Sequence, residues 1–146
     1  MISFREIDEN NYDDVLKVSL FEHQVGFIET VKECLDEAAE TKEWCPVGIY
    51  NENQLIGFAM YGAFSKHKYT WIDRIMIDKD YQGKGYGKEA MLKLIDIVTD
   101  KYQVDDVYLS LYDDNKVARQ LYERIGFHYI NEKDKNGELI FKYTRN

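Results

Sequence analysis

A glycine-rich stretch is the segment of this sequence whose residue types point most directly to chemistry. Residues 80–88 read DYQGKGYGK, between an apolar run and an amphipathic one. Glycines let backbone N–H groups approach a ligand closely, and the first N–H groups of a helix lack intrahelical acceptors and carry partial positive charge. The stretch therefore predicts an anion site suited to a pyrophosphate, to which Lys84 and Lys88 add positive charge.

The spacing of the glycines separates the known phosphate-binding motifs. A P-loop requires G-x-x-x-x-G-K-[ST], and its Lys-Ser/Thr pair is missing here. A dinucleotide fingerprint requires G-x-G-x-x-G, but Gly83 and Gly85 are followed by Lys88 at the third glycine position. The remaining pattern is Q-x-x-G-x-G, at Gln82, Gly85 and Gly87. Taken alone, this loop could also be only a turn.

A second stretch carries side chains suited to an extended ligand and to proton transfer. Residues 113–127 read DDNKVARQLYERIGF. Asn115, Ala118, Arg119 and Tyr122 fall at i, i+3, i+4 and i+7, so we expect them to share one helix face that spans about 10 Å. Taken separately, Asn115 could be only a helix cap and Tyr122 only a core residue.

Together the two stretches resemble the GNAT superfamily of N-acetyltransferases, through Q-x-x-G-x-G and N-x-x-A-x-x-L-Y-x-x-x-G-F. The resemblance implies one domain over residues 1–146 with the GNAT fold, an α/β (α+β) architecture. Its mixed, mostly antiparallel sheet has about six or seven strands flanked by about four helices. It also implies acetyl-CoA as co-substrate. The implied cofactor-binding residues are Ile75, Met76 and Ile77 on a bulged strand along the pantetheine arm, then Gln82, Gly83, Lys84, Gly85, Tyr86, Gly87 and Lys88, and finally Asn115, Ala118 and Arg119.

Four further segments narrow the resemblance to bacterial spermine/spermidine N-acetyltransferases. They are PVGIY (46–50), GFAMYG (57–62), WIDRIMIDKDYQGKGYGK (71–88) and YLSLYDDN (108–115). This likeness implies direct acetyl transfer to a primary amine of a polyamine. The alternatives are a GNAT enzyme for another amine, such as a protein N-terminus, a lysine or an aminoglycoside, and a non-catalytic sensor of acetyl-CoA.

Two residues are expected to handle the protons of such a transfer. An alkylamine has a pKa near 10.4, so under about 0.1% of it is neutral at pH 7 and a proton acceptor is useful. The resemblance implies that Tyr122 is the general acid for the leaving thiolate. Asp73, nine residues before Gln82, matches a catalytic Glu of other polyamine acetyltransferases but is one methylene shorter, which favours an intervening water. Asp73 could instead pair with Arg74 or orient the substrate ammonium.

Cysteine and histidine chemistry is not expected. Cys34 and Cys45 lie outside both motifs, which disfavours an acyl-cysteine route, and they are typical of reduced thiols in a cytoplasmic protein. The three histidines, His23, His67 and His128, lack metal-ligand spacing, so we expect no metal site.

The net charge of −8 is confined to the first third of the chain. Residues 1–45 hold 12 acidic and 4 basic side chains, whereas residues 46–146 hold 15 of each. Carboxylates at helical spacing are most often a solvated face, but as a group they could select a polycation. The candidates for substrate binding are Glu22, His23, Glu29 and Glu33. We expect no nucleic-acid or membrane partner, because there is no Lys/Arg cluster and no apolar run of about 20 residues. A homodimer is common among similar enzymes.

These residues must be positioned by alternating strands and helices. Hydrophobic periodicity predicts strands over residues 1–7, 47–50, 55–61, 68–78, 106–112, 127–130 and 138–143, and helices over 10–21, 26–40, 85–101 and 115–124. Strand–helix–strand units make parallel neighbours and hairpins make antiparallel ones, so the order indicates a mixed sheet with helices packed on it.

Overall fold

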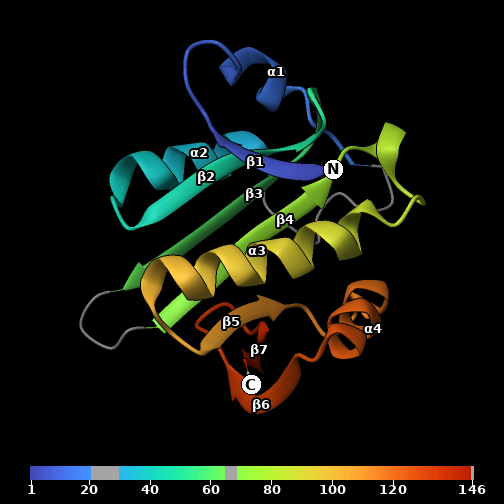
Figure 1. The fold of residues 1–146 in the computed structure, drawn as a ribbon. Helices are drawn as coiled ribbons and strands as arrows, with labels where there is room; N and C mark the ends of the chain where they lie inside the picture. The colour runs from blue at the N-terminus through green and yellow to red at the C-terminus, as the bar shows by residue number, and fades with distance from the viewer. Residues whose placement is uncertain (21–29, 65–68, 146) are drawn as a thin grey trace.

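The computed structural model describes residues 1–20, 30–64 and 69–145 of the chain. In this part of the chain one sheet has the strand order β1-β2-β3-β4-β5-β7-β6 (Figure 1). The strands are β1 (Ile2–Glu6), β2 (Trp44–Asn51), β3 (Gln54–Phe64), β4 (Tyr69–Ile77), β5 (Asp106–Leu111), β6 (His128–Lys133) and β7 (Leu139–Thr144). The helices are α1 (Tyr12–Leu16), α2 (Val31–Glu40), α3 (Tyr86–Tyr102) and α4 (Lys116–Ile125), with a 3-10 turn, η2 (Lys79–Tyr81). The predicted architecture is thereby confirmed.

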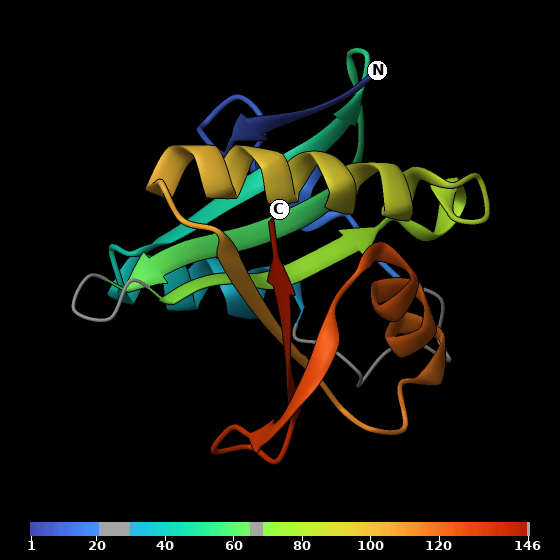
Figure 2. The ribbon, with the colours of Figure 1, turned by 60° about the horizontal axis from the view of Figure 1, so that its bottom comes forward.

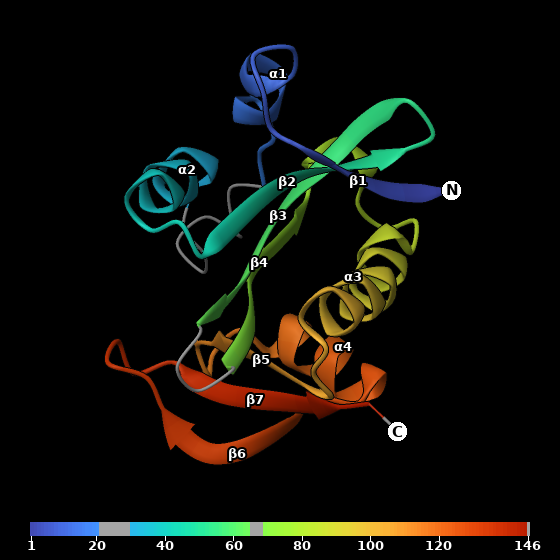
Figure 3. The same cartoon turned by 60° about the vertical axis from the view of Figure 1, so that its left-hand side comes forward.

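Helices cover both faces of the sheet because its central strands are apolar on both sides. Figure 3 shows α2 on one side of β2, β3 and β4 and α3 on the other. Under α1 and α2, Val15, Val31 and Cys34 pack against Phe58, Met60 and Met76. On the opposite face α3 buries Met91, Leu94, Ile95 and Val98 against the strands. Residues of β4 contribute to both cores, so this strand is packed on both of its faces.

The first predicted helix is wrong in its length. It was expected over residues 10–21, but α1 ends at Leu16. Beyond it the backbone of Ser19 is tied to the end of β4: its N–H donates to Asp78 Oδ2 at 3.0 Å, and its carbonyl accepts from the N–H of Lys79 at 2.8 Å. These long-range bonds compete with helical ones and draw the chain toward the glycine-rich loop.

The strands β4 and β5 diverge. They are the parallel pair of the sheet, and a single backbone register pair joins them, Trp71 with Tyr108, whereas β5 pairs with β7 along its whole length. Figure 2 shows the two strands separating toward their carboxyl ends, with α4 following β5. A side opening in the sheet results, next to the strand that was expected to contact a cofactor.

A β-bulge changes the direction of β4 just after Trp71, the residue that pairs with β5. Met60 of β3 pairs with Arg74, whereas the next residue, Tyr61, pairs with Ile72, so Asp73 is the extra residue. Bulges redirect side chains and interrupt pairing, and they are common beside active sites. A bulge was expected in this strand beside residues 75–77, and the structure places it two residues earlier, at Asp73.

Candidate active site

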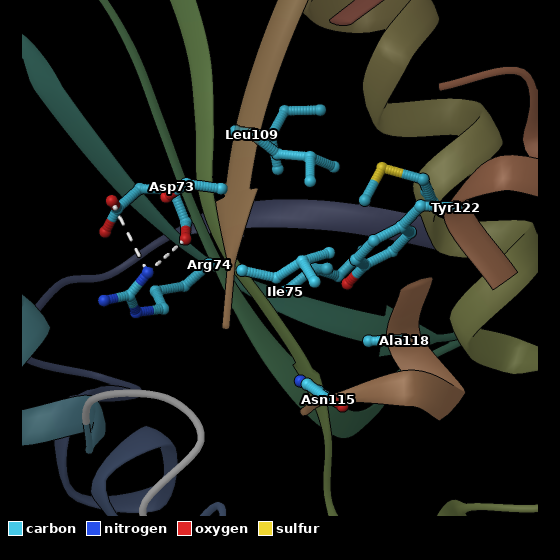
Figure 4. A pocket seen from close by; sticks show the side chains of 11 residues that line it. Asp73, Arg74, Ile75, Leu109, Asn115, Ala118 and Tyr122 are labelled. Carbon is cyan, nitrogen blue, oxygen red and sulfur yellow. Dashed lines mark hydrogen bonds and ion pairs between the residues drawn. The ribbon is translucent and has the colours of Figure 1, made fainter. Parts of the chain in front are cut away.

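Two adjoining pockets occupy the opening between β4 and β5. The smaller, about 30 Å³, is lined by residues 72–75 of β4, residues 109–111 of β5, Met91 of α3, and Asn115, Ala118 and Tyr122 (Figure 4). The larger, about 510 Å³, is lined by Leu20 and residues 75–77, 81–83, 85–87, 115, 117–118 and 121–122. Four residues line both pockets: Ile75, Asn115, Ala118 and Tyr122. The two pockets therefore form one continuous site.

The glycine-rich loop presents the N-terminus of α3 to the larger pocket. Gly83 and Gly85 have φ angles of 81° and 84°, which side-chain-bearing residues rarely adopt. Gly85 is the N-cap of α3 and has no side chain to accept hydrogen bonds from the first helical N–H groups. Gln82 Nε2 donates to the carbonyl of Ile77 at 2.9 Å and ties the loop to β4. This arrangement suits a phosphate at a helix N-terminus.

The start of α4 faces both pockets. Asn115 stands at the N-cap position, but its side chain makes no capping hydrogen bond. The reading of Asn115 as only a helix cap therefore lacks support. Ala118 lies one turn further along and Tyr122 one turn beyond that, so this face of the helix lines the site.

Three predicted cofactor residues do not line either pocket. Lys84 and Lys88 are exposed on the loop and on the first turn of α3. Arg119 was expected to share a face with Asn115 and Tyr122, but its guanidinium lies over the rings of Tyr129 and Phe141, at 5.9 and 5.4 Å. It also makes ion pairs with Asp113 at 2.9 Å and Glu123 at 3.6 Å. Those carboxylates and the aromatic rings turn Arg119 toward the β6–β7 hairpin.

Tyr122 is held in an apolar setting. Its ring packs edge-on against Phe127 with centroids 6.0 Å apart, and in Figure 4 its side chain points toward Ile75. Burial raises the pKa of the Tyr122 phenol to about 12, and the positive charge of Arg74 opposes that shift. The phenol therefore keeps its proton throughout the neutral range and can donate it.

Asp73 and Arg74 lie at the other end of the small pocket. Arg74 is 8% exposed; its Nη1 donates to the backbone carbonyl of Asp73 at 2.6 Å and lies 3.6 Å from Asp73 Oδ1 (Figure 4). One alternative for Asp73, a pairing with its neighbour, is thus present. The same ion pair also holds the carboxylate beside the pocket.

Of the four predicted acceptor residues, the structure describes Glu33. It forms a capping box with Thr30 at the start of α2: the Thr30 N–H donates to Glu33 Oε1 at 3.1 Å, and the Glu33 N–H donates to Thr30 Oγ1 at 3.2 Å. These bonds hold the pKa of Glu33 below its usual value, and the charge of Arg74 lowers it further. Glu22, His23 and Glu29 lie outside the described residues.

Some residues of the site had no distinct sequence signal. Leu20, Tyr81, Val117 and Leu121 line the larger pocket without having been predicted. Val117 is 83% exposed, and the apolar side chain at this position, between the motif residues Asn115 and Ala118, could have indicated that it lines the site. Outside both pockets, Glu138 is 7% exposed beside β7, and its place after a turn gave no sign of burial.

In residues 1–20, 30–64 and 69–145 no group of three or more His, Cys, Asp or Glu side chains is arranged to hold a metal ion. Within the same ranges no helix combines the length and the apolar character needed to cross a membrane. Both cysteines there are free thiols.

Known proteins resemble the chain in sequence and in fold. The model of the acetyltransferase (GNAT) family matches residues 6–127. The chain is 39% identical to a probable spermine N(1)-acetyltransferase of Bacillus subtilis subsp. natto and 38% identical to the spermine/spermidine N(1)-acetyltransferase of Bacillus subtilis strain 168, each over 95% of both chains. A solved spermidine N-acetyltransferase of Vibrio cholerae, in complex with CoA and spermine, shares the fold with a TM-score of 0.77 and 14% identity, over 99% of this chain and 95% of that one.

The sequence matches and the geometry of the pockets indicate the same family. The family model spans both motifs, and the site that the structure forms between β4, β5, α3 and α4 contains residues from each of them. The chain belongs to the GNAT family of acetyltransferases and is an N-acetyltransferase.

Proposed function

We propose that this enzyme transfers the acetyl group of acetyl-CoA to a primary amine of a polyamine such as spermine or spermidine. The observation that carries the proposal is the 38–39% identity, over 95% of the chain, to relatives named as spermine and spermine/spermidine acetyltransferases. The acidic first third of the chain supports a cationic acceptor.

The larger pocket fits the parts of acetyl-CoA. Past Trp71 the backbone of β4 has no register pair with β5, so residues 75–77 can hydrogen-bond the amides of a pantetheine arm. The N–H groups of Gly83, Gly85 and Gly87 and the start of α3 suit the pyrophosphate. Lys84 and Lys88 remain candidates for the more solvent-exposed phosphates, and Arg119 would have to leave its ion pairs with Asp113 and Glu123 to reach them. Acetyl-CoA supplies an activated acetyl group as a thioester.

The small pocket places proton-handling groups at its two ends. The amine must lose one proton before it attacks and another as the amide forms, while the departing thiolate needs one. Tyr122 holds its proton at neutral pH and serves as the donor to the thiolate. Asp73, directly or through water, accepts a proton from the amine or orients its ammonium group, and Arg74 holds its carboxylate in place.

The acceptor side includes the first two helices. Glu33 supplies a carboxylate from α2, and Glu22, His23 and Glu29 remain proposed contacts for the distal ammonium groups. A homodimer and a cytoplasmic location likewise remain predictions.

Release of thiol from acetyl-CoA tests this proposal, with spermidine, spermine, a lysine peptide and an aminoglycoside as acceptors. Saturable release with the polyamines at the highest kcat/KM supports it. Turnover on the peptide or the aminoglycoside alone would reject the polyamine claim. Binding of acetyl-CoA without turnover on any amine would indicate a sensor instead.

A further inference from the structure

A buried carboxyl group beside β7 has no part in the reaction described so far. Glu138 is 7% exposed and directly precedes β7. Its N–H donates to Asp134 Oδ1 at 3.0 Å, and its carbonyl accepts from the N–H of Asp134 at 2.9 Å. These bonds close the β6–β7 turn and fix the backbone at this residue. Carboxyl groups are rarely buried to this degree unless they are paired or functional.

The sheet register places Glu138 at the end of β5 that borders the small pocket. The residues after it, Leu139 and Ile140, pair with Leu111 and Ser110 of β5. Both of these β5 residues line the small pocket. Glu138 lines neither pocket, but β5 lies between β4 and β7 in the sheet, so Asp73 and Glu138 stand on the two sides of the strand whose end borders the small pocket.

The positive charge of Arg74 acts on Glu138 and also on Asp73 and Glu33, two of the residues proposed to contact the substrate. Its guanidinium lies 3.6 Å from Asp73 Oδ1, and its charge acts on the carboxyl groups of both Glu138 and Glu33. These three carboxyl groups come from β4, from the β6–β7 turn and from α2. One guanidinium therefore acts on carboxyl groups from three elements, and such a gathering of carboxyl groups favours a cationic substrate.

We propose that Glu138 is a further substrate-binding residue, which together with Asp73 accepts hydrogen bonds from the reacting ammonium group and orients it for transfer. This inference rests on the proposed function, because it presupposes a cationic acceptor. Asp73 has a short side chain on a bulge, and a second acceptor on the other side of β5 fixes the direction of the ammonium group as well as its position.

The charge state of Glu138 gives the proposal a pH signature. Burial raises the pKa of Glu138 to about 7; Arg74 opposes the shift, and Asp134 and Asp73 add to it. Only the ionised carboxylate attracts an ammonium ion. Since the ammonium itself stays charged until about pH 10, affinity for the amine should rise as the pH increases through 7.

Steady-state kinetics of Glu138→Gln with spermidine, from about pH 6 to about pH 9, test the proposal. In the wild type, KM for spermidine should fall as the pH passes through about 7. In the variant, KM at about pH 8 should be about tenfold higher, with a flat pH dependence and kcat close to the wild-type value. Glu132→Gln, an exposed carboxylate on the adjacent strand β6, is the matched control and should behave as the wild type.

Unfolding experiments show whether Glu138 instead has a structural role. The ordinary pKa is 4.5 and the folded value is about 7, so between these values the folded state holds a proton that the unfolded chain has lost. Wild-type stability should therefore fall as the pH rises across this range, whereas Glu138→Gln should escape that fall and be the more stable protein at about pH 8.

Four results overturn the inference. They are an unchanged KM in Glu138→Gln, a loss confined to kcat, the same change in Glu132→Gln, and a variant less stable than the wild type at about pH 8. Each leaves the proposed function standing if the wild type acetylates spermidine. A wild-type enzyme that acetylates no polyamine would overturn the proposed function itself, and this inference with it.

Discussion

At the scale of single residues, Tyr122 and Asp73, the proposed proton donor and proton acceptor, lie at opposite ends of one small pocket. Tyr122 lies on α4, Asp73 on the β4 bulge, and Ile75 beside both. Their surroundings differ. Burial keeps the phenol of Tyr122 protonated, whereas the carboxylate of Asp73 lies 3.6 Å from the guanidinium of Arg74.

Replacement of Tyr122 by Phe should lower kcat about a hundredfold or more, because general acid catalysis typically contributes that much. The affinity for acetyl-CoA should stay near the wild-type value, since the ring is retained. Stopped-flow or steady-state thiol release measures kcat, and calorimetry measures the affinity. Because the pKa of Tyr122 is about 12, wild-type kcat should not decline near pH 10 for lack of this proton.

Tyr143→Phe is a matched control for that variant. Like Tyr122, Tyr143 packs against the ring of Phe127, with ring centroids 5.6 Å apart, but it lines neither pocket. The control should retain wild-type kcat. If Tyr122→Phe retained it too, Tyr122 would not be the acid.

At the scale of elements, periodicity predicted the order of strands and helices because the packing on this sheet is two-sided and regular. The motif residues Gln82, Gly85 and Asn115 were predicted from the resemblance, and each lines the larger pocket. The strand β5 diverges from β4 and pairs with β7 along its whole length. This pairing is between segments far apart in the sequence, so no local pattern predicts it.

Other features that the local sequence does not reveal also have tertiary causes. The helix α1 stops early because Ser19 bonds to Asp78 and Lys79, which directly follow β4. Arg119 turns away from the pocket toward Asp113 and the β6–β7 aromatic rings. Glu138 is buried by strand register, which its local sequence does not reveal.

The loop before α3 yields a prediction about acetyl-CoA binding. Gly85→Ala should raise KM for acetyl-CoA severalfold, because φ at Gly85 is 84° and an alanine there strains the backbone that presents the N–H groups. An added Cβ meets no atom within 4 Å, so the effect comes from conformation rather than from a clash. The left-handed geometry should also cost about 1 kcal/mol of stability.

Gly137→Ala provides the control with the same strain. Its φ is 83°, an added Cβ again meets nothing within 4 Å, and it lies in the β6–β7 turn. Thermal unfolding should show similar losses in the two variants. A KM for acetyl-CoA that rises equally in both would mean that lost stability, and not the loop geometry, accounts for the change.

At the scale of the whole molecule, charge is divided unevenly between two parts of the chain. The neutral part, residues 46–146, contributes nearly all of the larger pocket, whereas the acidic part, residues 1–45, includes α1 and α2. An acidic acceptor side should attract polyamines over monoamines, and salt should weaken that preference.

Glu33→Gln tests this division. KM for spermine should rise a few-fold and KM for butylamine should stay unchanged, because only the polycation reaches a second carboxylate. Gln retains the capping role at this position, so α2 should remain folded. Thr30→Ala weakens the same capping box without changing charge and should leave the ratio of the two KM values alone. An equal effect of Glu33→Gln on both amines would indicate a merely solvated face.

The most direct test of the whole account is the identity of the acetylated product. Wild-type protein, acetyl-CoA and spermidine should yield mono-acetylated spermidine in equal molar amount to the released thiol, as quantified by mass spectrometry and a thiol assay. The same mixture with Tyr122→Phe should yield little of either. Thiol release without acetylated spermidine, or acetylation of a peptide in preference to spermidine, would contradict the account.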